Sequence, residues 1–252
     1  MKRFYSEVAI AEESDGWTVR LDGRAIRTQG GQPQRVPNSA LAELLAAEWR
    51  DQGETLDPRR FVHRDLADYA IDVIAPNPEP VREGLLAYIE TDTLCYRADP
   101  DEHFWRRQQQ MWEPLVADFE AREQVVLERV SGVMHRPQRP ATLATLRARL
   151  GGLGPFELAA LKTLTSLAAS LCVGLSVLRQ DADAQALWSA ANLEEDWQAE
   201  HWGIDEEAQA ARDLRTGQFF AALDFARAAT ADRRWLSRST RRPAGRGRWL
   251  PD

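Results

Sequence analysis

The sequence predicts an α+β protein in which a small antiparallel β-rich N-terminal domain is followed by a larger orthogonal helical domain. Up to about residue 36, short alternating runs are separated by turn residues, whereas after Pro37 the apolar spacing becomes helical. Strands and helices do not alternate along the chain, which argues against β-α-β units. The expected divisions are residues 1–78, 79–232 and a basic tail at 233–252.

The N-terminal strands are predicted from alternation and turn residues. The run FYSEVAIAE alternates imperfectly, and SDG at 14–16 marks a turn before WTVRL. Asp22-Gly23 then lies between WTVRL and RAIRT, which is a strong hairpin signal because both positions of a tight turn need a positive φ. We expect a meander of short antiparallel strands.

Helices are predicted from Asn38 onward. Asn38 is expected to cap a helix that Gly53 ends, and a second helix stops at the proline-rich segment 75–80. Pro80 suits the first turn of a third helix. A helix over 104–120 contains Pro114, which predicts a kink or a break.

The last third is also predicted to be helical. The apolar run from Pro155 to Leu178 is interpreted as one buried helix, because an apolar stretch of about 20 residues would be needed to span a membrane. Asp181 or Asp183 is expected to cap the next helix, which would carry NLEEDWQAEHWG at 192–203. Gly203 would end it, and a final helix capped by Asp205 would run to about Ala229.

Charge and cysteine content limit the classes of function. A net charge of -7 argues against a nucleic-acid partner for the body of the protein. The tail at 233–252 holds seven arginines and one acid, and we interpret it as a flexible appendage. Two isolated cysteines are typical of a reduced compartment. No secretory or transit segment is recognisable at the N-terminus.

A search for chemical motifs predicts neither an enzyme nor a metal or cofactor site. The four histidines lack helix-spaced partners, and no His-Glu-x-x-His motif is present. Neither cysteine lies in a nucleophile motif. The GGLG segment at 151–154 follows a predicted helix, so a turn between helices is favoured over a phosphate-binding loop.

The stretch 192–203 has two distinct helical lines. Leu193 and Trp197 share one line, which is typical of a core-facing edge. Glu194, Gln198 and Trp202 form another at i, i+4 and i+8. A tryptophan beside an acid and an amide is typical of a docking surface, although a partly buried core edge remains an alternative.

Seven motifs occur in order along the chain. They are RFY (3–5), LDGRAIRT (21–28), AAEWRDQGETLDP (46–58), YIETDTLCYR (88–97), WEPL (112–115), PFELAALKTLTSLAASLCVGLSVL (155–178) and LEEDWQAEHWG (193–203). Between about residues 3 and 229 the chain therefore resembles the assembly chaperone family for the catalytic head of F-type ATP synthase, the family that handles the α subunit. The tail lies outside the resemblance.

The resemblance implies a molecular chaperone rather than an enzyme, without cofactor or metal. Such a protein holds the unassembled α subunit of F-type ATP synthase soluble until β subunits replace it. We expect a monomer in the bacterial cytoplasm, with eukaryotic relatives in the mitochondrial matrix. The implied partner-binding residues are Glu194, then Gln198, Trp202 and Gly203. Residues that match family motifs with either a structural or a binding role are Trp49, Asp92, Tyr96 and Arg97.

Two alternatives follow from the residues themselves. One is a small-molecule enzyme with a site in the interdomain cleft, which would use Asp92, Cys95, Tyr96 and Arg97. The other is a nucleic-acid or membrane adaptor that acts through the arginine-rich tail.

Overall fold

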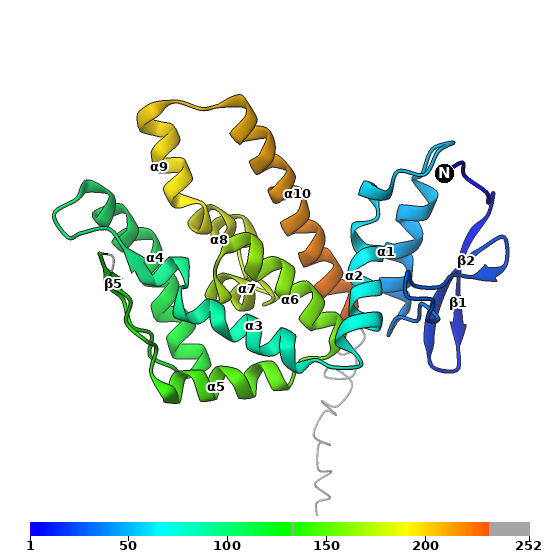
Figure 1. Ribbon diagram of the computed structural model, residues 1–252, viewed down its shortest axis with the longest axis horizontal. Coiled ribbons are helices and arrows are strands. Elements are labelled where there is room, and N and C mark those ends of the chain that lie inside the picture. Colours follow the sequence, from blue (N-terminus) through cyan, green and yellow to red (C-terminus); the bar gives the residue numbers. More distant parts are fainter. Residues whose placement is uncertain (133, 232–252) are drawn as a thin grey trace, which may run out of the picture.

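A computed structural model describes residues 1–132 and 134–231 and has the α+β architecture that the sequence predicts (Figure 1). A small sheet lies at one end of the long axis, and helices make up the remainder. The arginine-rich tail, with its expected flexibility, lies outside the described residues.

The N-terminal sheet is the predicted meander, with strand order β1-β2-β3. Antiparallel pairing joins β1 (Val8–Glu13) to β2 (Gly16–Leu21), and β2 to the two-residue β3 (Arg24–Ala25). Asp22 and Gly23 have φ values of 49° and 78°, as the tight turn requires. A second, parallel pair, β4 (Tyr96–Arg97) with β5 (Val130–Ser131), lies within the helical part.

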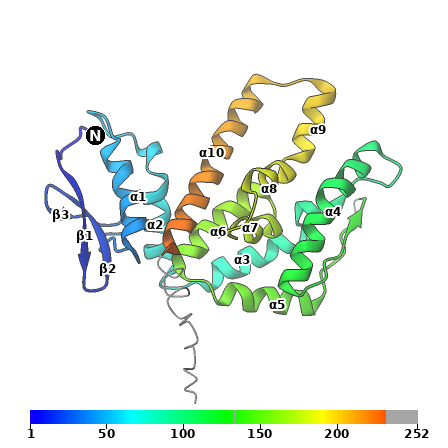
Figure 2. The ribbon, with the colours of Figure 1, turned by 180° about the vertical axis from the view of Figure 1, so that it is seen from behind.

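Of the first two helices, one packs against the N-terminal sheet and the other lies on the far side of the first, away from the strands (Figure 2). Asn38 caps α1 (Ser39–Arg50) through a hydrogen bond from the Leu41 amide. The prediction that Gly53 ends this helix is wrong, because α1 stops at Arg50 and Asp51 follows in right-handed geometry. The 3-10 turn η1 (Pro58–Arg60) leads into α2 (Val62–Tyr69), whose last turn widens into the π-helix η2 (Ala70–Ile74).

Three further helices follow along the lower and left sides of the molecule in Figure 1. Pro80 lies in the first turn of α3 (Glu79–Glu90), as predicted. The 3-10 turn η3 (Thr93–Cys95) then leads through β4 to α4 (His103–Glu123), and α5 is Pro140–Gly151. Pro114 does not break α4. Proline has no N–H to bond the carbonyl oxygen of residue 110, but both residues lie on an exposed side of the helix, where water can replace the lost bond.

The apolar run 155–178 forms two helices, which corrects the prediction of one. The chain turns between α6 (Pro155–Ala168) and α7 (Leu171–Val177). Ala169 adopts a left-handed conformation with φ 46°, and Ser170 caps α7 by accepting from the Val173 amide. The two helices then pack closely, since a Cβ at Gly174 would lie 2.4 Å from the Thr165 hydroxyl oxygen.

The following segment is also divided. Asp183 caps α8 (Ala184–Ala191), but the stretch of interest is the separate helix α9 (Leu193–Trp202), which corrects the prediction that Asp181 or Asp183 would cap it. Gly203, with φ 90°, ends α9, and Asp205 caps α10 (Glu206–Ala229), both as predicted. The buried amide of Asn192 donates to the Trp188 carbonyl oxygen, which fixes the bend between α8 and α9.

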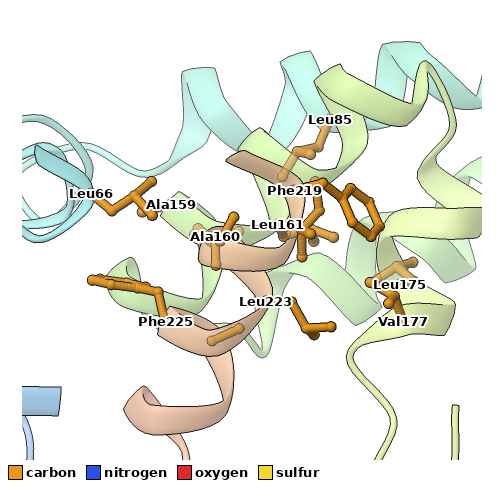
Figure 3. Packing of buried hydrophobic residues seen from close by; sticks show 14 of the residues in the cluster. Leu66, Leu85, Ala159, Ala160, Leu161, Leu175, Val177, Phe219, Leu223 and Phe225 are labelled. Atoms are coloured by element: carbon orange, nitrogen blue, oxygen red, sulfur yellow. The ribbon is translucent and has the colours of Figure 1, made fainter. Parts of the chain in front are cut away.

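The buried apolar residues form one continuous cluster around α6 and the lower half of α10 (Figure 3). Phe219, Leu223 and Phe225 of α10 lie against α6 residues such as Ala160. The cluster includes residues from both predicted domains, and the division at residue 78 stays a prediction. Among the described residues, no helix is long and apolar enough to cross a membrane.

Candidate partner-binding surface

An exposed arch is formed by α9, the loop 203–205 and the first half of α10 (Figure 1). All residues from 200 to 211 are exposed, and in α9 only Leu193 is buried. Three acids, Glu194, Glu195 and Asp196, occupy the first turn of α9, where the helix dipole favours negative charge.

One side of α9 is fastened to α10. Asp196 forms an ion pair with Arg212, and Glu195 forms one with Arg215 at 2.8 Å. The hydrogen bond with the Asp196 carboxylate raises the pKa of Arg212. These two contacts use two of the three acids in the first turn of α9.

A second side of α9 is fastened to α4. Arg107 makes a bidentate contact with Glu200, at 2.6 and 2.8 Å. This contact lowers the pKa of Glu200. The Trp197 ring lies 5.4 Å from the Phe104 ring, between centroids, and 5.7 Å from the Arg107 guanidinium. Trp197 is thus partly buried against α4, which fits its predicted core-facing line.

The remaining side of α9 faces solvent. Its residues are Glu194, Gln198 and Trp202, which we call the α9 open face. Trp202 is 78% exposed. Within the described part of the chain, the Glu194 carboxylate accepts one hydrogen bond, at 3.4 Å from the Gln198 side-chain amide. The predicted line therefore presents an exposed indole and an exposed carboxylate to the outside.

A groove of about 680 Å³ lies between α9 and α10, beside the open face. Apolar or small groups form much of it, and a rim of charged groups surrounds them. The arch, residues 193–217, has eight acids and two arginines, and Arg107 of α4 pairs with one of the acids, so an excess of negative charge remains to attract basic groups. The residues that line the groove include Gln198, Trp202, Gly203, Ile204, Ala208 and Ala211.

Two features of the arch were not predicted from the sequence. The orientation of α9 is fixed by Arg107 of α4 and by Arg212 and Arg215 of α10. The sequence around these arginines does not reveal that they pair with acids of α9. Ile204 is 70% exposed and adds to the apolar rim beside Trp202. Its position between a helix-ending glycine and a capping aspartate, where polar residues are usual, was an available signal.

The other predicted residues lie elsewhere and inside the fold. Trp49 is 9% exposed and its ring lies 4.5 Å from that of Phe61. The Asp92 carboxylate is fully buried, and burial raises its pKa. It accepts hydrogen bonds from the Ser170 hydroxyl at 2.7 Å and from the Cys172 amide at 3.0 Å, so it holds the start of α7.

Tyr96 and Arg97 also have internal partners. The Tyr96 hydroxyl donates to the Glu90 carbonyl oxygen at 3.1 Å. The Arg97 guanidinium, 4% exposed, donates to the Leu94 carbonyl oxygen and pairs with Glu113 at 3.1 Å. Burial lowers the pKa of Arg97. The structure therefore does not bring these residues to the α9 open face.

No group of three or more histidine, cysteine, aspartate or glutamate side chains lies close enough to hold a metal ion within residues 1–132 and 134–231. The chemistry available at the arch is recognition of another molecule by an exposed indole, an amide and a carboxylate.

Solved structures of known proteins share the fold of this chain. The structure of Atp12 from Paracoccus denitrificans is 38% identical, with a TM-score of 0.82 over 90% of this chain and 97% of that chain. This chain belongs to the ATP12 chaperone family. It is the ATP synthase assembly family that the ordered motifs indicated, and the family model of the ATP12 chaperone protein matches residues 2–120.

Further relatives of the ATP12 chaperone family come from bacteria and mitochondria. The Atu1473 protein of Agrobacterium tumefaciens is 36% identical, with a TM-score of 0.86 over 90% of this chain and 85% of that chain. The mitochondrial protein atp12 of Schizosaccharomyces pombe is 26% identical over 219 residues, which is 82% of this chain and 75% of that protein.

Proposed function

We propose that this member of the ATP12 chaperone family binds the unassembled α subunit of F-type ATP synthase and holds it soluble. A lone α subunit exposes surface that is meant for β subunits, and such surface aggregates. A chaperone that covers it transiently prevents this, and arriving β subunits can displace the chaperone by competition. The function requires neither a cofactor nor catalysis.

The observation that carries this proposal is the α9 open face. Ion pairs to α4 and α10 hold two sides of α9, so the third side is presented in a fixed orientation without support from the core. Pre-organised aromatic anchors with polar neighbours are typical of binding hot spots. We assign partner contact to Glu194, Gln198 and Trp202, and to the turn at Gly203.

The second group of predicted residues is assigned to folding. The Asp92 carboxylate joins η3 to α7, and Arg97 links β4 to α4. Since Asp92 and Cys95 are fully buried, no observation favours the alternative of a small-molecule enzyme that uses them. We further propose that the protein acts as a monomer in the bacterial cytoplasm. Sedimentation of the purified protein would measure its oligomeric state.

The test is a pull-down of the cognate α subunit with wild type and Glu194→Lys. Glu194 is exposed near a helix N-terminus, so the substitution should cost less than about 1 kcal/mol of stability. Asp224→Lys, an equal charge change at an exposed position near the other end of α10, is the control. We expect capture by wild type and Asp224→Lys, and loss with Glu194→Lys.

The results of this pull-down test the assigned site and the proposed partner separately. Equal capture by a folded Glu194→Lys protein would remove Glu194 from the site. Absence of capture by wild type would remove the α subunit as the partner.

A further inference from the structure

The groove between α9 and α10 has apolar walls that the rest of the described chain leaves open. Trp202 and Ile204 line it where α9 ends, and Ala208 and Ala211 line it from α10. All four residues are exposed. Apolar surface that gathers at an exposed groove is a usual site for another polypeptide segment, and when left open it also attracts unrelated proteins. The groove can therefore hold an apolar occupant, and the charges around it determine the charge of that occupant.

The arch around this groove keeps an excess of negative charge after its ion pairs are counted. Three of its eight acids pair with Arg107, Arg212 and Arg215. The other five acids are exposed and form no ion pair with any residue that the structure describes. They are Glu194, Asp205, Glu206, Glu207 and Asp213. The dipole at the start of α10 offsets only about half a charge, so the surroundings of the groove favour a basic occupant.

A segment of the complementary character lies in the same chain. The tail at 233–252 has seven arginines and one acid, and it contains the pair Trp-Leu twice, at 235–236 and at 249–250. Arginines precede both pairs. Tryptophan and arginine are enriched among binding hot spots, because each offers a large contact surface together with polar groups. The tail therefore holds two candidate occupants, and their distance from the groove distinguishes them.

The length of α10 determines which of the two pairs can reach the groove. α10 leads from the arch to Ala229, and the described chain ends at Ala231, far from the groove along this helix (Figure 1). Ala208 in the groove wall lies about 32 Å from Ala229, because each helical residue rises about 1.5 Å. An extended chain covers at most about 3.5 Å per residue. Trp235 can therefore reach only about 14 Å beyond Ala231, whereas Trp249 can reach about 63 Å.

The covalent connection also gives this contact an advantage that a free peptide lacks. A flexible connection from Ala231 to Trp249 would have a root-mean-square length of roughly 23 Å, comparable to the span along α10. A segment connected in this way has an effective concentration on the order of millimolar. Weak contacts are therefore sufficient to fill the groove, and a partner with stronger contacts can displace them.

We propose that residues 241–250 of this chain occupy the groove while no partner is bound and leave it when the partner binds. This segment has four arginines and no acid. Trp249 covers the apolar wall beside Trp202, and the arginines lie beside the unpaired acids of the arch. The segment competes with the α subunit for the same surface, and the identity of this competitor rests on the proposed function. The segment shields the apolar wall from unrelated proteins until the α subunit displaces it.

Crosslinking within the full-length protein locates the segment in the absence of any partner. An aromatic photoreactive residue would replace Leu250, which keeps Trp249, and the matched control would carry it in place of Leu236 beside Trp235. We expect crosslinks from position 250 to residues 194–211, and none to that range from position 236. A mixture of isotope-labelled and unlabelled protein shows whether a crosslink joins two copies. The proposal is overturned if position 250 gives no crosslink to the arch, or gives one only between two copies.

Competition with the partner measures how often the segment fills the groove. The distal variant combines Arg246→Gln, Arg248→Gln and Trp249→Ala in the full-length protein. The proximal control makes the same changes at Arg233, Arg234 and Trp235. With the groove filled in about four of five free molecules, the distal variant binds labelled α subunit about fivefold more tightly than wild type. The Kd of the control should differ from wild type by less than about twofold, and added salt should reduce the gain of the distal variant.

The two measurements test the tail contact and the proposed function separately. If the distal variant binds the α subunit no more tightly than the proximal control, the segment does not compete, and the proposal is overturned while the proposed function stands. If wild type does not bind the α subunit but position 250 still crosslinks to the arch, the proposed function is overturned and the tail contact stands.

Discussion

Truncation of Trp202 should reduce partner binding with almost no effect on folding. A tryptophan buries about 150–250 Å² when it is covered, and Trp202 is 78% exposed in the free protein. At about 25 cal/mol per Å², covering this surface contributes about 3–5 kcal/mol. Ordering and desolvation offset part of it, so we expect Trp202→Ala to weaken binding by about 2 kcal/mol, roughly 30-fold in Kd.

The assay for this prediction is a titration of labelled α subunit with each variant, beside urea unfolding of the same samples. Met134→Ala is the matched control, since Met134 is 76% exposed and lies outside the arch. Both substitutions should change the free energy of unfolding by no more than about 0.5 kcal/mol. A Trp202→Ala protein that binds as tightly as Met134→Ala would show that Trp202 is not an anchor for the partner.

Three further predictions concern the groups that support the arch and the core. Asp92→Ala should lower the free energy of unfolding in urea by about 3 kcal/mol, because the buried Cys172 amide loses its acceptor, and Asp92→Asn should cost less. Arg107→Gln should raise the Glu200 pKa, followed by NMR, toward its ordinary value. Because Arg107 lowers the pKa of Glu200, their ion pair stabilises the folded protein fully above the ordinary pKa of a glutamate. This stabilisation is lost as the pH falls through the lowered pKa of Glu200. Gly203→Ala should cost about 1–3 kcal/mol, measurable by urea unfolding, since φ 90° with ψ 168° is accessible almost only to glycine.

The elements that were predicted correctly are those set by local chemistry. The Asp22-Gly23 turn needs two positive φ values. Asn38 and Asp205 each cap a helix through a side chain that accepts from a backbone amide a few residues further along the chain. Gly203 ends α9 for the same local reason. Such features depend on neighbours a few residues away, so the sequence alone is sufficient.

The breaks that were missed depend on distant residues. Ala169 has a left-handed conformation without the glycine that normally signals it, and the following turn is held by Asp92, which lies far away in sequence. The bend between α8 and α9 is likewise fixed by the buried amide of Asn192 within an otherwise helical run. Apolar periodicity continues across both breaks and therefore conceals them.

For the candidate site, the helical spacing alone predicted which residues share a line. Glu194, Gln198 and Trp202 do lie together on an exposed face, and Trp197 lies against α4. The sequence could not reveal why that face is open, because the ion pairs that orient α9 come from Arg107 on one helix and Arg212 on another. Partner contact at these residues stays a prediction.

Photo-crosslinking shows whether the α9 open face touches the α subunit. A photoreactive residue would replace Gln198 or Trp202 on the α9 open face, and in a separate variant the partly buried Trp197 on the α4-facing side. We expect crosslinks to the α subunit from positions 198 and 202 and far fewer from 197. A complex that forms normally but crosslinks from neither 198 nor 202 would contradict it.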